Sequence, residues 1–168
     1  MAAKRTSGVS NVIQVTAKAS VAFPANSFVT FDGSTGYIKP LTATDPSVFG
    51  TILGTIATTD ADYASSKTVL VDQGDIDQVW EVDVSNAGAA TPFALTDVGQ
   101  FFKMGSTASV IDANTRSSTA GAGFTAQGLV FLCVGFISAT TVVSDGATAS
   151  GKGLFKIMSM SQARPSST

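Results

Sequence analysis

The residues that most often carry acid, base or nucleophilic chemistry are scarce in this chain of 168 residues. It contains no histidine, so the commonest general base and the usual pH-sensitive metal ligand are missing. A Ser-His-Asp triad is therefore impossible; a Ser–Lys pair stays open, but no such pair stands out. The one cysteine, Cys133, lies inside the apolar segment Leu129–Ile137 and has no neighbouring cation to activate its thiol. We expect no catalytic residues, and the chain is not predicted to be an enzyme.

Two patterns are similar to ligand-binding motifs but lack essential parts of them. In the segment Gly146–Gly153, a glycine follows Lys152 where a phosphate-binding loop needs serine or threonine, and the next residues predict a strand. The densest acidic run lacks the alternating oxygen ligands of a calcium-binding loop. It consists of Asp72, Asp75, Asp77 and Glu81. We interpret the first segment as a hairpin loop and the second as a solvated turn, and we predict no metal and no cofactor.

Charged residues make up only 13% of the chain, with 10 basic and 12 acidic side chains and a net charge of −2. A typical soluble domain is about 25% charged. The slight acidic excess argues against a general nucleic-acid binder. Sparse charge indicates either a monomer with a hydroxyl-rich surface or, as we favour, a subunit that buries much of its surface against other chains. The apolar run Leu129–Ile137 is too short for a membrane span, which needs about 20 residues, so no membrane contact is predicted.

The periodic segments are rich in Val, Ile, Thr and Phe and are separated by turn signals, a pattern typical of β-strands. Strands are predicted at 9–16, 27–31, 37–41, 51–57, 67–72, 78–84, 100–104, 109–112, 128–137, 140–143 and 153–158. Residues 94–99 form a predicted helical turn. We expect an all-β fold, either a compact β-sandwich or a small β-barrel, with long loops and a flexible N-terminal arm. Residues 1–16 are expected to be the arm or an edge strand, 17–158 a single β domain, and 159–168 a polar tail.

Four segments, taken in order, are similar to one known family. They are Ala22–Gly33 with Gly36–Pro40, Asp77–Val84, Leu95–Gly99, and Leu129–Ile137 with Gly153–Met158. Together they resemble the capsid decoration, or cement, proteins of tailed bacteriophages. The resemblance implies a small β-rich virion protein that binds the outside of an assembled icosahedral head. It also implies a homotrimer whose partner is the major capsid protein, located on the capsid exterior after synthesis in the host cytoplasm.

This hypothesis assigns no chemistry to the chain, only contacts that bridge neighbouring capsomers and so stabilise the capsid lattice. The expected capsid contacts lie in the N-terminal segment at Val9, Val12, Ile13 and Val15. These residues could order on contact and add a strand to an edge of the shell, or they could belong to an ordinary edge strand of the fold itself.

Two other functions stay open. The chain could be a different β module of the virion, such as a tail, neck or fibre subunit. It could also be a carbohydrate-binding module, which needs a row of solvent-facing aromatic side chains. The available candidates are Tyr37, Tyr63 and Trp80.

Overall fold

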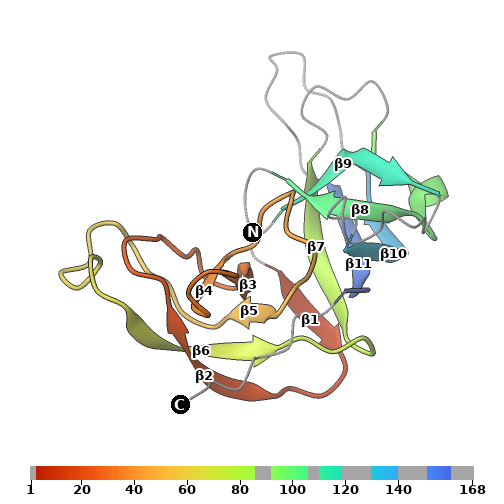
Figure 1. Cartoon of the computed structure of the whole chain (residues 1–168). Helices are drawn as coiled ribbons and strands as arrows, with labels where there is room; N and C mark the ends of the chain where they lie inside the picture. The colour runs from red at the N-terminus through yellow and green to blue at the C-terminus, as the bar shows by residue number, and fades with distance from the viewer. Residues whose placement is uncertain (1–2, 86–91, 106–109, 119–129, 140–150, 160–168) are drawn as a thin grey trace.

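A computed structural model describes residues 3–85, 92–105, 110–118, 130–139 and 151–159. In this part of the chain all regular structure is β, apart from one 3-10 turn, η1, at Leu95–Asp97. The strands form two small barrels that lie side by side (Figure 1). The all-β prediction is therefore confirmed, with the barrel as the observed alternative.

The first barrel is built from the N-terminal part of the chain. Its strands, in ladder order, are β2 (Val12–Ala17), β4 (Ile38–Pro40), β3 (Phe28–Phe31), β5 (Gly50–Ile52) and β6 (Lys67–Gln73). The predicted hairpin is present, since β3 and β4 pair antiparallel across the turn that begins at Asp32. Alternate strand residues such as Val29 and Val71 point inward, and they fill a core together with Phe23 and Phe49, which lie outside the strands.

The second barrel is built from the remaining strands. In ladder order these are β7 (Val79–Ser85), β11 (Gly151–Ile157), β10 (Phe131–Ser138), β8 (Phe101–Met104) and β9 (Val110–Ser117). A parallel pairing between β9 and β7 closes the ring. The strand predicted at 128–137 from its apolar character on both faces is central, because β10 lies between β11 and β8. A further strand, β1 (Lys4–Ser7), pairs with the first half of β7.

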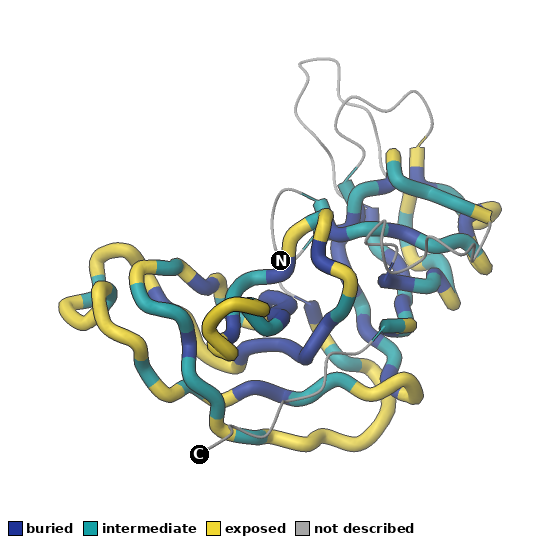
Figure 2. The backbone as a smooth tube through the Cα atoms, in the orientation of Figure 1, coloured by how far each residue is buried: buried dark blue, intermediate teal, exposed yellow. Residues whose placement is uncertain are grey.

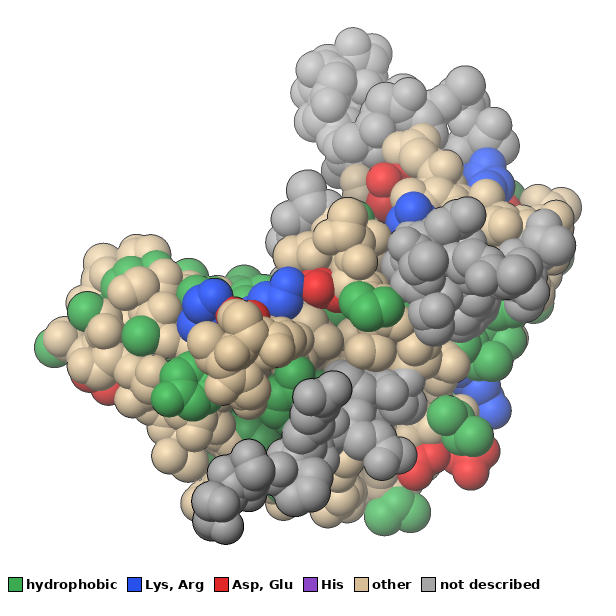
Figure 3. All heavy atoms as spheres, in the orientation of Figure 1, with side chains coloured by type: hydrophobic (Ala, Val, Ile, Leu, Met, Phe, Trp, Pro, Cys, Tyr) green, Lys and Arg blue, Asp and Glu red, His purple; other side chains and the backbone are tan. Residues whose placement is uncertain are grey.

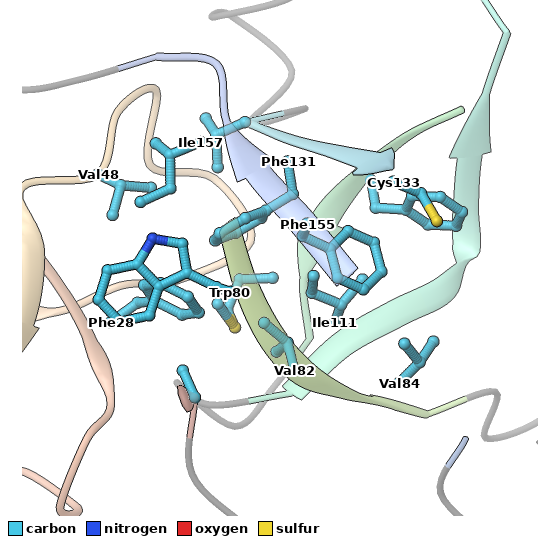
Figure 4. Close-up of a cluster of buried hydrophobic side chains, with 14 of the residues drawn as sticks. Phe28, Val48, Trp80, Val82, Val84, Ile111, Phe131, Cys133, Phe155 and Ile157 are labelled. Atoms are coloured by element: carbon cyan, nitrogen blue, oxygen red, sulfur yellow. The ribbon is translucent and has the colours of Figure 1, made fainter. Parts of the chain in front are cut away.

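The cores of the two barrels meet at a few large side chains. Phe28 belongs to a strand of the first barrel, yet its ring packs against Trp80 and Phe131 of the second, with ring centroids 5.7 and 4.9 Å away (Figure 4). Leu41 and Val48 join the same cluster. Residues 17–158, expected to be a single domain, thus contain two barrels that share buried contacts.

The N-terminal segment crosses from one barrel to the other. It contributes β1 to the second barrel and then β2 to the first, so of the two alternatives stated for residues 1–16 the described residues are mainly paired strand. The exposed stretch between the two strands is visible along the lower margin of the molecule (Figure 2). The strand predicted at 140–143, residues 146–150 of the predicted hairpin loop and the tail beyond Ser159 lie outside the described residues. Residues 151–153, also expected in that loop, instead belong to β11.

Candidate interaction surface

The outer wall of the first barrel presents apolar side chains to solvent. Along β2, Ile13 and Val15 point inward and pack against the first core, so Val12 points outward and is 47% exposed. Leu70, on the neighbouring strand β6, is 47% exposed, and Leu53, the residue after β5, is 44% exposed. The Leu53 N–H donates to the Leu70 carbonyl at 3.0 Å. We call Val12, Leu53 and Leu70 the β2–β6 face.

This apolar surface extends over only part of the barrel. Figure 3 shows hydrophobic side chains emerging among mostly uncharged polar groups on one side of the first barrel. Val9, just before β2, is 84% exposed. Of the four residues predicted to contact a capsid, Val9 and Val12 therefore face solvent, whereas Ile13 and Val15 are half-buried against the core of the barrel.

A buried glutamine holds the crossover between β1 and β2 in place. Gln78 is 1% exposed, and its Nε2 donates to the Val9 carbonyl at 2.6 Å. Gly8 has a φ of +92°, and a Cβ there would lie 2.6 Å from the Gln78 Cγ. Glycine is required at this position both because of its left-handed backbone and because of the close approach of Gln78. The Val9 side chain is therefore exposed on a backbone whose position is fixed by the hydrogen bond to Gln78.

A buried carboxylate holds the same crossover from the other side. Asp72 is 5% exposed and accepts hydrogen bonds from Ser10 Oγ at 2.9 Å and from the Asn11 backbone N–H at 3.2 Å. Arg5 Nη1 lies 3.0 Å from its Oδ2, so the buried charge is paired. These contacts fix the path of the chain into β2, and a partner binding here would not have to order a loose segment.

An open hollow of about 430 Å³ lies between the barrels next to the β2–β6 face. Leu53 belongs to both, and the hollow also reaches Thr51, Trp80 and the Arg5–Asp72 pair. The carboxylate and guanidinium already neutralise each other there. The hollow therefore offers shape and apolar area next to the β2–β6 face, and Lys4, which also lines it, contributes a positive charge.

The candidate chemical groups are engaged in structural contacts. Asp75 Oδ1 accepts from the Asp77 backbone N–H at 3.0 Å, and Glu81 binds Lys152 Nζ at 2.8 Å. The acidic run is thus divided among separate contacts, and the described residues contain no cluster of three or more groups able to hold a metal ion. Cys133 is buried, and burial raises the pKa of its thiol to about 11, so the thiolate is scarce at neutral pH.

The three aromatic residues considered for carbohydrate binding do not form a solvent-facing row. Trp80 is 2% exposed and belongs to the buried cluster that also contains Phe28, Leu41 and Val48. Tyr63 packs against the first core, and its hydroxyl donates to the Ser20 carbonyl at 2.8 Å. Tyr37 remains, at 38% exposed. The feature on which that alternative depended is therefore missing from these residues.

Most of the exposed apolar side chains were not predicted from the sequence. Leu70 lies in a predicted strand that has apolar residues on both faces, and this pattern could have indicated an apolar side chain on the outer face.

The exposure of Val134 and Ile137 has a different cause. The register of β10 against β11 slips twice, and each slip leaves an extra residue on β10. Such bulges redirect side chains, and these two residues are 37% and 45% exposed.

Comparison of the chain with protein-family models, with curated proteins and with solved structures found no match. Within the described part of the chain there is no helix with the length and apolar character needed to cross a membrane.

Proposed function

We propose that this chain is a structural protein of a tailed-phage virion that binds the outer surface of the assembled head and stabilises the capsid lattice. Its partner is the major capsid protein, and copies of the chain associate as a homotrimer that bridges neighbouring capsomers. The protein is made in the host cytoplasm and resides on the capsid exterior.

The observation that carries this proposal is the exposed apolar surface made by Val9 and the β2–β6 face on a fixed backbone. Apolar area held in a defined shape favours association with another protein surface. A protein that binds only the assembled lattice stabilises the lattice by mass action, and several contacts made by one oligomer strengthen one another through effective concentration. No bond-making step is required of the chain.

The ionic side chains support the same proposal. Several basic residues lie within 4 Å of a carboxylate of the same chain. These pairs are Arg5–Asp72, Lys18–Asp32, Lys39–Asp45, Lys67–Asp62, Arg116–Asp97 and Lys152–Glu81. Cations neutralised in this way contribute little to the attraction of an oppositely charged partner. Recognition through shape and apolar burial fits this distribution of charge.

The proposal is tested with expanded, empty phage heads. Purified protein is expected to bind them and to raise their disruption temperature. The variant Leu70→Asp places a charge in the β2–β6 face, and its burial at an interface should weaken head binding on the order of tenfold or more. The matched control is Ser65→Asp, which introduces the same charge at an exposed position of the loop before β6, away from Val12, Leu53 and Leu70.

The outcomes distinguish the proposed decoration role from the proposed contact through the β2–β6 face. If micromolar protein fails to bind intact heads, the decoration role is wrong. If heads bind both variants as well as they bind the unmodified chain, the role stands and the β2–β6 face is not the contact. Equal loss in both variants would indicate a general effect of added negative charge.

A further inference from the structure

One edge of strand β2 is paired with another strand at a single residue only, within the described part of the chain. It pairs with β6 along its whole length, from Val12 opposite Asp72 to Ala17 opposite Lys67. On its other side the ladder with β4 consists of the single pair Ala17 and Ile38. Residues 3–85 are all described, and none of them forms a strand beside 12–16 on the side away from β6. Figure 1 places β2 at the lower margin of the first barrel.

Among the described residues, no strand pairs with the backbone groups of Val12 and Gln14 on this edge. The Lys18 N–H donates to the Ile38 carbonyl on the β4 side, whereas the Asn11 carbonyl accepts from the Gln73 N–H on the β6 side. Backbone groups alternate in direction along a strand, so those of Val12 and Gln14 point away from β6. Unpaired N–H and C=O groups at a sheet edge are a template for another strand.

The edge lacks the features that usually protect such a template. Lysine, proline, inward-pointing charge and bulges discourage edge-to-edge pairing. The segment 8–17 contains no charged residue and no proline, and the register of β2 against β6 is regular. Val12 and Gln14 are exposed, while Ile13 and Val15 are half-buried and keep apolar area that an added strand would cover.

We propose that β2 of a second copy of this chain pairs antiparallel with β2 along this edge, about a two-fold axis at Gln14. This register places Val12 opposite Thr16 and Ile13 opposite Val15 of the other copy, so that β-branched side chains meet in favourable cross-strand pairs. No like charges face each other because neither strand carries any. A two-fold contact uses the same patch on both copies, and this segment is complementary to itself.

The pairing goes beyond the proposed function and does not depend on it, because it requires only the purified chain. A two-fold contact cannot be one of the equivalent contacts within the proposed homotrimer, so it is a separate contact that joins copies from two different trimers. The variant Gln14→Cys tests it directly. In an antiparallel ladder, directly opposite residues that exchange hydrogen bonds have Cα atoms about 5.5 Å apart, which is within the range that a disulfide spans. The native thiol of Cys133 is buried and gives little background.

The expected result is a covalent dimer of Gln14→Cys under mild oxidation at about 10 µM protein, a concentration at which weak contacts are populated. The control is Thr68→Cys, exposed on β6 and away from the edge, which should give several times less dimer. Equal yields from the two variants, or no dimer from either, would overturn the proposal.

A second variant tests the backbone itself. Proline cannot donate a hydrogen bond but is tolerated where the N–H of an edge strand faces outward. Gln14→Pro should therefore keep the circular dichroism spectrum of the native chain, and sedimentation should show an assembly of half the native mass at the same protein concentration, because only the two-fold contact is lost. Unchanged association in this folded variant would contradict the pairing. Failure to bind phage heads leaves both results unaffected, so the two proposals fail separately.

Discussion

Phe28 is the side chain that most directly links the two barrels, and the substitution Phe28→Ala tests whether they share a core. The residue is fully buried, and its ring contacts Trp80 edge-on, with an interplanar angle of 70°. It also contacts Phe131 at a centroid distance of 4.9 Å. The ring lies between two sets of hydrogen-bonded strands, which limits how far the surrounding structure can collapse into the space that alanine would leave.

The expected loss of stability follows from this geometry. Replacing a buried phenylalanine with alanine costs about 3–5 kcal/mol, more where the cavity stays open, and each lost aromatic pair contributes about 0.5–1.5 kcal/mol of that. A loss of about 4 kcal/mol is a large part of a typical unfolding free energy of about 5–15 kcal/mol. For a chain of this size it lowers the unfolding temperature by about 8–16 °C.

The matched control is Phe49→Ala, because Phe49 is equally buried but belongs to the first core, where its ring packs against Phe31 at 4.5 Å. Both variants should lose similar stability in thermal or denaturant unfolding followed by circular dichroism. Only Phe28→Ala should also change the native fluorescence of Trp80, the one tryptophan of the chain. A loss below about 1 kcal/mol, or an unchanged Trp80 emission in Phe28→Ala, would refute the shared core.

Two further predictions concern single groups. The Cys133 thiol should resist Ellman's reagent in the native protein at pH 8, because burial raises its pKa to about 11, and it should react once the chain is unfolded; rapid labelling of the native state would contradict its burial. The unfolding temperature should change little between about pH 5 and 8, because no histidine titrates there. The unfolding temperature should fall below about pH 4. Hydrogen bonds from Lys18 and Ser34 hold the pKa of Asp32 below its ordinary value. A carboxyl group whose pKa is lowered by folding stabilises the protein above its unfolded-state pKa, and this contribution is lost on acidification. A step in stability near pH 6.5 would contradict this account.

Local features of the sequence predicted many of the strands but not their long-range pairing. The turn residues 32–36 specify the hairpin of β3 and β4, and the alternation of Trp80, Val82 and Val84 with polar residues specifies β7. The parallel pairing that closes the second barrel joins β7 to β9, and no local pattern encodes it. The same holds for the crossover of the N-terminal segment, which depends on contacts with Asp72 and Gln78 far along the chain.

The candidate surface was harder to predict because polarity alone does not show which groups are exposed. Gln78 and Asp72 are polar residues next to turns, where solvent contact is the ordinary expectation, yet both are buried and hold the segment that displays Val9. Leu53 and Leu70 are apolar and half-exposed. The usual assignment of polar residues to the surface and apolar residues to the core is reversed here, and such a reversal becomes visible only when the strands are placed.

The structure shows what several of the few charged side chains do. Several of the few carboxylates are themselves buried and fix loops: Asp45 accepts from the Thr42 backbone N–H at 2.7 Å, and Asp97 accepts from that of Ala94 at 2.9 Å. Their cationic partners, Lys39 and Arg116, lie beside them. These charged side chains thus stabilise loops within the molecule. The open edge of β2 and the β2–β6 face contain no charged residue. A rigid body with an uncharged, self-complementary edge is suited to association with its own copies and with other protein surfaces, where geometry rather than long-range attraction selects the partner.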